Sequence, residues 1–183
     1  MKLNLAIVCG AVLALATGSA VSQATVSKLQ MTALTSPEDA VSARRLLMTT
    51  IGNNNDILHD TFDGYFEYSD REVRGRLDAI STMLLTFPHL YRGEPDVWTP
   101  EIEATDPARA SHSLPLIWED WDGFYAMATA AAQTAFEASM TTDREKQRVL
   151  IEDLEVQCES CHASYRRELP SVDFDELIGP ANP

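Results

Sequence analysis

The sequence predicts an all-α protein folded as an antiparallel, up-down-up-down four-helix bundle. Four segments carry apolar residues at helical spacing, and no stretch alternates apolar with polar residues as a half-buried strand would. The connections between the first and second segments and between the third and fourth are short, so each pair should lie side by side in opposite directions. Apolar residues make up 45% of the 183 residues and charged residues 23%, a composition typical of a globular domain.

The first two helices have clear start signals. Ser36 is placed to cap a helix with Pro37 at its first position and acidic residues after it, and this helix should run to about His59 or Phe62. The second helix opens on the capping box 69–72, Ser-Asp-Arg-Glu. It then presents one apolar stripe before Pro88 ends it, formed by Val73, Leu77, Ile80, Leu84 and Phe87.

The third and fourth helices follow a long connection. Residues 88–114 lack periodicity and contain several prolines, so we interpret them as a loop that joins the two halves. The third helix should begin near Pro115 and end near Met140, and its alanine-rich run 128–132 would allow close helix packing. The fourth opens on another capping box, Thr-Asp-Arg-Glu at 142–145, and should continue to about Arg167.

The N-terminal residues 1–24 have the pattern of a secretory signal peptide. Lys2 precedes an apolar run of about a dozen residues, shorter than the roughly 20 of a membrane span, and small residues lead to an expected cleavage after Ala24. Residues 25–35 would form an N-terminal lead, 36–168 the helical domain and 169–183 an acidic tail. We expect an exported, soluble protein of the periplasm, with no integral membrane segment after signal removal.

The charge balance constrains the partners. Acidic residues outnumber basic ones by 28 to 14, which gives a formal net charge of −14. A chain of this charge repels phosphate backbones, so nucleic acid is excluded as a partner. The same charge favours a redox partner protein that carries a basic patch.

One motif carries specific chemistry, the segment Cys158-Glu159-Ser160-Cys161-His162. It is the C-x-x-C-H attachment site of c-type haem, in which two thiols add to the porphyrin vinyl groups and the histidine binds the iron. A thioredoxin-like pair would need a βαβ setting, a disulfide would need no histidine, and a zinc site would need two further ligands. The other histidines are scattered, at His59, His89 and His112. We therefore predict one covalent haem c per chain, in the bundle interior and attached to the C-terminal helix.

Three stretches resemble the class II c-type cytochromes, the cytochrome c′ family with its low-spin, methionine-ligated relatives. The residues from Cys158 to Arg166 match the family's C-x-x-C-H-x-x-aromatic-Arg, and Pro37-Glu-Asp-Ala-Val41 with Arg44-Arg45-Leu46-Leu47-Met48 resembles its first helix. Leu116-Ile117-Trp118 is similar to the start of its third helix, although Pro115 lies one position nearer than expected. The resemblance spans roughly residues 36–168.

The resemblance implies roles for four further residues. It places Met48 on the distal side of the iron and Arg44 and Arg45 against the haem edge or its propionates. It places Arg166 beside the proximal histidine. Each arginine also has a simpler interpretation: Arg44 and Arg45 as a solvent-facing helix surface, and Arg166 as a cation favoured by the helix dipole.

Two functions remain in view. If the Met48 sulfur binds the iron opposite His162, the protein is an electron carrier, and Gly52 favours this choice because a glycine one turn on lets the helix approach the porphyrin or a neighbouring helix. The alternative is a five-coordinate cytochrome c′ that binds NO or CO at an open distal site. We expect no enzyme, because no distal acid or base is placed, and we interpret Met83 and Met127 as core residues. Members of the family are often dimers, so a homodimer is also possible.

Overall fold

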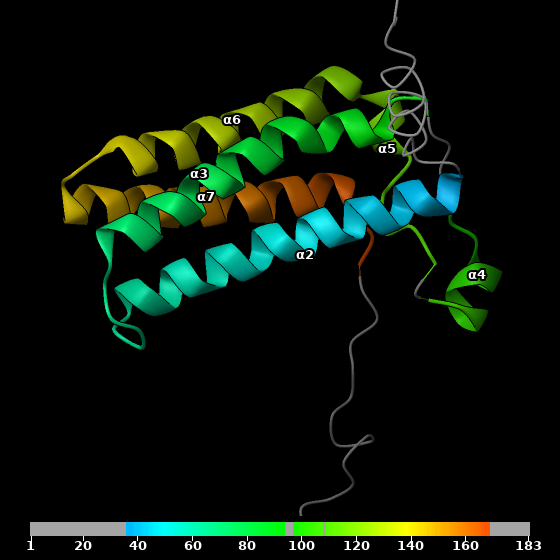
Figure 1. Cartoon of the computed structure of the whole chain (residues 1–183). Coiled ribbons are helices and arrows are strands. Elements are labelled where there is room, and N and C mark those ends of the chain that lie inside the picture. Colours follow the sequence, from blue (N-terminus) through cyan, green and yellow to red (C-terminus); the bar gives the residue numbers. More distant parts are fainter. Residues whose placement is uncertain (1–35, 94–96, 108, 169–183) are drawn as a thin grey trace, which may run out of the picture. The chain divides into compact units, whose positions relative to one another are not determined.

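The computed structural model describes residues 36–93, 97–107 and 109–168 (Figure 1). Its long helices are α2 (Pro37–Phe62), α3 (Asp70–Thr86), α6 (Trp121–Met140) and α7 (Arg144–Tyr165). Successive long helices run in opposite directions (Figure 1), which confirms the predicted all-α antiparallel four-helix bundle. The predicted signal peptide, N-terminal lead and acidic tail lie outside the described residues. Within the described ranges, none of the helices is both long and apolar enough to span a lipid bilayer.

The first two long helices begin where their capping signals predict. The Ser36 hydroxyl accepts a hydrogen bond from the Asp39 backbone N–H at 3.1 Å, and the Ser69 hydroxyl accepts one from Glu72 at 3.4 Å. Each hydroxyl replaces a helical carbonyl that the first turn lacks. Local side-chain chemistry therefore sets the start of α2 and α3.

α7 begins one residue later than its capping box predicts. Its N-cap is Asp143 and not Thr142, because the Asp143 carboxylate accepts from the backbone N–H groups of Glu145 and Lys146 at 3.0 and 3.1 Å. A charged acceptor also stabilises the positive end of the helix dipole, which a hydroxyl does less well.

The predicted third helix is divided in two. α5 (Leu116–Glu119) ends at Asp120, whose carboxylate accepts a hydrogen bond from the Gly123 N–H at 3.2 Å and caps α6. A Cβ at position 123 would overlap that carboxylate as it lies, so a larger residue there would require the Asp120 side chain to shift. The break sets α6 at its own angle to the short α5 (Figure 1).

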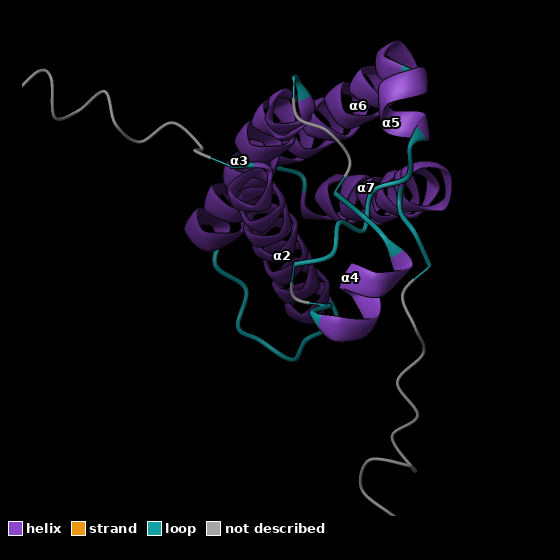
Figure 2. Ribbon diagram, turned by 90° about the vertical axis from the view of Figure 1, so that its right-hand side faces the viewer, coloured by secondary structure: helices purple, strands orange, loops and turns teal. Residues whose placement is uncertain are grey.

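The connection 88–114 is not an unstructured loop. Pro88 ends α3 as predicted, but the chain continues in the 3₁₀ helix η1 (Phe87–Tyr91), where proline fits the first turn. A second short helix, α4 (Pro100–Thr105), is capped by the Thr99 hydroxyl, which accepts from the Ile102 N–H at 3.1 Å. Figure 2 shows α4 apart from the long helices and linked to the bundle by loops.

The bundle is held together by two apolar clusters. The first joins all four long helices and includes the alanines of α6 that face α3, so the predicted close packing of this run extends from Ala128 to Ala138. The second is aromatic and lies at the end of the bundle where α7 finishes, formed by Phe87, Tyr91, Ile117, Phe124 and Tyr165. Small side chains thus bring α3 and α6 together, while large rings fill the opposite end.

Candidate functional site

The C-x-x-C-H segment lies in the last two turns of α7. Residues three and four positions apart share one face of a helix, so Cys158, Cys161 and His162 present their side chains to the same side. Both thiols are free and partly buried, with Cys158 packed against the first cluster and Cys161 against the second. The three side chains line one cavity between α2 and α7.

This cavity has a volume of about 1020 Å³. Small-molecule pockets span roughly 300–1,000 Å³, so it has room for a large cofactor. Its α7 wall carries the two thiols and the imidazole. The walls of α3 and α6 are apolar, whereas the α2 wall mixes apolar side chains with polar and charged ones such as Asn55 and Asp56. The apolar residues on these walls include Val41, Met48, Ile51, Leu84, Phe124 and Met127. A flat apolar macrocycle with two carboxylates fits this set of walls better than a small polar ligand does.

The chemical states of the motif residues suit covalent haem. Burial raises the pKa of the Cys158 thiol to about 11, helped by the negative charges of Glu155, Cys161 and Glu159, and burial alone raises that of Cys161 to about 11. A site that disfavours thiolates suits uncharged thioethers better than a zinc–thiolate centre. Within the described residues, no group of three or more His, Cys, Asp or Glu side chains could hold a metal ion.

His162 is prepared to act as a ligand through its neutral form. Burial lowers the pKa of its imidazole, and the nearby positive charge of Arg166 lowers it further. A histidine must lose its second proton before it can bind a metal, so both effects favour coordination.

Met48 lies on the cavity wall that α2 contributes. It is partly buried and packs against both apolar clusters. Gly52, one turn further on, also lines the cavity, but a Cβ there would meet nothing within 4 Å. The expected close approach of this glycine to a neighbouring helix is therefore wrong, and its approach to a porphyrin stays a prediction. Met127 lines the same cavity from α6, which places it nearer the site than its interpretation as a core residue implies.

The two arginines of α2 line the cavity and also fix the connection 88–114. The Arg44 guanidinium is buried, donates from Nε and Nη2 to the Leu90 carbonyl at 3.0 and 2.9 Å, and lies 4.2 Å from the centre of the Tyr91 ring. Its interpretation as a solvent-facing residue is therefore wrong. Arg45 Nη1 donates to the carbonyls of Pro107 and Ala110 at 2.8 and 3.2 Å. Contact of either side chain with haem stays a prediction.

Sequence reasoning placed the segment 109–114, which we call the strap, in the connection 88–114 but assigned none of its residues to the site. It closes the cavity at the end of α7, and three of its residues line the cavity, Ser111, His112 and Ser113. Its backbone pairs with the chain around Arg166, which also lines the cavity. No periodicity or motif in the strap indicates this position, because it depends on contacts with distant residues.

Tyr165 is a second residue that sequence reasoning did not assign. It is buried on the cavity wall, and its hydroxyl donates to the Asp120 carboxylate at 2.9 Å. Burial and this negative partner raise the pKa of Tyr165 to about 12. The phenol therefore stays protonated and ties the end of α7 to the start of α6.

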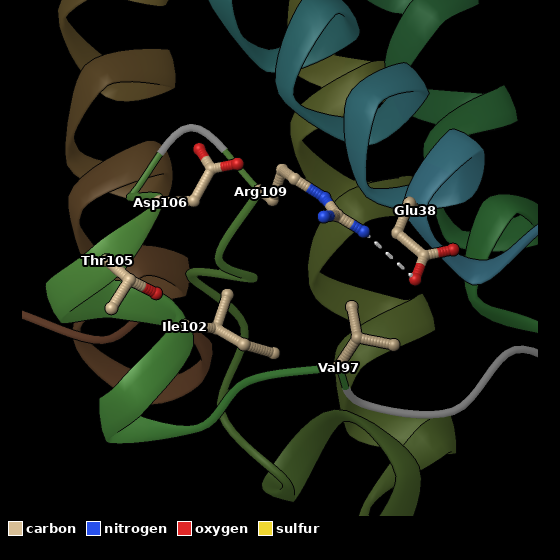
Figure 3. Close-up of a pocket in the computed structure, with 6 residues that line it drawn as sticks. All are labelled: Glu38, Val97, Ile102, Thr105, Asp106 and Arg109. Carbon is tan, nitrogen blue, oxygen red and sulfur yellow. Dashed lines mark hydrogen bonds and ion pairs between the residues drawn. The ribbon is translucent and has the colours of Figure 1, made fainter.

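A smaller hollow of about 250 Å³ lies between α4 and the start of α2 (Figure 3). An ion pair between Arg109 and Glu38, at 3.4 Å, crosses one side of it. The remaining walls come from Val97, Ile102, Thr105 and Asp106. None of its six lining residues is a cysteine or histidine, so this hollow is not the predicted haem site.

Comparison with known proteins identifies one family. A family model described as Cytochrome C′ matches residues 39–166. Cytochrome c′ from Thermochromatium tepidum superposes with a TM-score of 0.62 at 19% identity, covering 74% of this chain and 100% of that one. Native cytochrome c prime from Alcaligenes xylosoxidans gives a TM-score of 0.61 at 19% identity, with the same coverage. A nitrosyl complex of a variant of the Alcaligenes protein gives 0.61 at 19%, again covering 74% and 100%. No curated protein sequence matches this chain.

Proposed function

Because the chain belongs to the cytochrome c′ family, whose members carry covalent haem c, we propose that it binds a diatomic gas, NO or CO, at a haem attached to Cys158 and Cys161. The observation that carries the proposal is the cavity between α2 and α7, with a neutral imidazole on one wall and apolar side chains on the facing wall. When bound, haem supplies an iron whose second axial position can take a ligand. The proposed location is the periplasm.

Three residues of this chain would hold the haem. The two cysteines tether the macrocycle, and His162 holds the iron from the α7 wall. Val41, Met48, Ile51 and Leu84 carry no proton donor or charge, so this apolar part of the lining favours small uncharged ligands. The proposed function is binding and not turnover.

A second candidate, electron transfer, is favoured by one observation. Met48 lines the same cavity as His162 but from the opposite helix, which is where a sixth ligand would have to come from. A thioether on the iron would close the gas site and favour the ferrous state. The family match and the nitrosyl complex of a structural neighbour support gas binding more directly.

Optical spectra of the purified protein, oxidised and reduced, with and without CO, test the proposal. Gas binding predicts a high-spin spectrum and rapid uptake of CO. A low-spin ferrous spectrum with poor CO uptake would instead show that a side chain occupies the sixth position, for which Met48 is the candidate. In that case Met48→Ala should open the site, whereas Met127→Leu, which alters another methionine of the cavity, should not.

We also propose two kinds of partner. The net charge of −14 favours a redox partner with a basic patch. A second copy of the chain is another candidate partner, since one structural neighbour is a cytochrome c′ with an unusual ligand-controlled dimer dissociation. Sedimentation of the holoprotein with and without CO would detect a dimer and any effect of the gas on it.

A further inference from the structure

The strap is fixed to the chain on both sides of Arg166. The backbone N–H of Leu114 donates to the Tyr165 carbonyl at 2.9 Å, and the N–H of Arg167 donates to the His112 carbonyl at 2.8 Å. His112 therefore has its backbone tied to the residues that follow the C-x-x-C-H segment. Its side chain lines the cavity from this fixed position.

The surroundings of His112 are rich in positive charge. Burial lowers the pKa of its imidazole, and the guanidinium groups of Arg45 and Arg166 lower it further, while Glu103 acts in the opposite sense. Arg45, His112 and Arg166 all line the same cavity. Arg45 and Arg166 thus form a cationic cluster with His112, although the cavity lining as a whole also includes carboxylates, among them Glu159 and Glu168. Such a cluster is stabilised when an anion enters it.

The three groups come from different parts of the fold. Arg45 belongs to α2 and is held in place by the carbonyls of Pro107 and Ala110, Arg166 follows α7, and His112 belongs to the strap. The hydroxyls of the two neighbouring serines of the strap are engaged in other hydrogen bonds. Ser111 accepts from the Ser113 N–H at 3.3 Å, and the Ser113 hydroxyl pairs with the Tyr91 hydroxyl at 3.1 Å. The imidazole is therefore the ionisable group that the strap brings to the cavity.

We propose that His112, together with Arg45 and Arg166, binds a carboxylate side chain of the haem, and that the charge of His112 tunes the reduction potential of the haem. The proposal rests on the proposed haem attachment at Cys158 and Cys161, but it holds for either axial ligation of the iron. His112 is a positioning and tuning residue, because it acts on the iron through the charge it places near the macrocycle.

The sign of the effect follows from the charge of the iron. A cationic imidazole disfavours the ferric state, which carries one more positive charge than the ferrous state, and so it raises the potential. The imidazole is cationic at low pH and neutral at high pH, so the potential of the unmodified protein should fall as the pH rises through the titration of His112.

Two substitutions separate this role from a structural one. His112→Gln removes the charge at every pH, and His112→Arg keeps a positive charge at every pH. The unmodified protein should follow the His112→Arg potential at low pH and the His112→Gln potential at high pH. A side chain that only supported the strap would shift both variants in the same direction.

The experiment is a spectroelectrochemical titration of the holoprotein across pH, after the optical spectrum has shown covalent haem in each sample. Absence of covalent haem from the unmodified protein would refute the proposed attachment itself. His89→Gln is the matched control, because His89 is exposed, lies against Tyr125 and does not line the cavity. Glu103→Gln should move the pH step to lower pH, since Glu103 favours the cationic imidazole.

Three results would overturn the proposal. They are a pH-independent potential in the unmodified protein, the same pH step in His112→Gln, and equal shifts in His112→Gln and His112→Arg. The titration is run in chloride buffers and again with inorganic phosphate. A pH step that requires phosphate would mean that the cluster binds a free anion and not a haem carboxylate, and this too would overturn the proposal. If the His112 variants fail to fold, the unmodified protein and Glu103→Gln still decide the outcome.

Discussion

The side chains of the α7 wall are held in uncharged states before any cofactor binds. Burial keeps Cys158 and Cys161 as thiols, and burial with the Arg166 charge keeps His162 as a neutral imidazole. An exposed C-x-x-C-H segment in an unfolded chain would have more acidic thiols and a more basic imidazole. The fold thus favours the uncharged forms of the two thiols and the imidazole in a motif that is already recognisable in the sequence.

The raised pKa values of the thiols predict slow alkylation of the haem-free protein. With a pKa of about 11, each thiol is mostly protonated at pH 8. Because the thiolate is the reactive form, we expect iodoacetamide to react roughly 100-fold more slowly with the folded chain than with the chain in urea, where thiols have a pKa of about 8.5. The rate in the folded chain should rise as the pH approaches 11. Equal rates with and without urea at pH 8 would contradict the burial of these thiols.

His162 is the histidine whose loss should abolish the native haem spectrum. His162→Ala removes the imidazole from the wall that carries both thiols, whereas His59 and His89 do not line the cavity. Optical spectra of the three alanine variants test this prediction, and each sample should first be shown by mass to retain its haem. A spectrum lost equally in His59→Ala or His89→Ala would show that the iron ligand has been misassigned.

At the scale of the elements, α6 serves two purposes. Its alanine face packs against α3, and its aromatic N-terminal part covers the end of the cavity through Phe124. The Asp120 carboxylate connects α6 to α7, because it accepts hydrogen bonds from the Gly123 N–H at the start of α6 and from the Tyr165 hydroxyl at the end of α7. One acidic side chain therefore caps the start of α6 and holds the last residue of α7 beside it.

The alanine face predicts a strong dependence of stability on side-chain size. Ala135 is fully buried in the first apolar cluster, so Ala135→Leu should lower the free energy of unfolding by about 1–3 kcal/mol through overpacking. Ala130→Leu is the matched control, because Ala130 lies on the exposed face of the same helix and should change stability little. Urea denaturation of both variants measures the difference. Equal free energies of unfolding for the two variants would show that the side chains around Ala135 are not closely packed.

At the scale of the whole molecule, the bundle is asymmetric about its cavity. α3 and α6 pack directly, as do α6 and α7, whereas α2 faces α7 mainly across the cavity. A bound macrocycle would fill the space between the inner face of α2 and α7, and it would add an apolar surface there. The cofactor is therefore expected to complete the bundle as well as to bind ligands.

This asymmetry predicts local opening in the haem-free chain. A Cys158→Ser/Cys161→Ser double variant should show faster amide hydrogen exchange in α2, while the exchange of α3 and α6 changes much less, because these two helices pack directly against each other in the first cluster. Exchange mass spectrometry of this variant against the holoprotein measures the difference helix by helix. Uniform loss of protection in all four long helices would contradict the prediction and indicate that the bundle unfolds as one unit without haem.

From the amino-acid sequence we could predict the fold class, the starts of α2 and α3, and the grouping of Cys158, Cys161 and His162. These features are local: helical periodicity, side-chain capping and the spacing of a covalent attachment motif act within a few residues of one another. The cytochrome c′ family was also recognisable from such local stretches.

The surroundings of that motif follow from long-range contacts in the folded chain. Arg44 meets the Leu90 carbonyl, 46 residues away, and the strap pairs with the end of α7 across a comparable separation. The position of His112, the break at Asp120 and the open space beside Gly52 likewise depend on how distant segments pack. Such contacts leave no periodic signal in the sequence. Each depends on burial and hydrogen bonding between two distant segments, and neither segment's own residue pattern indicates which segment it will contact.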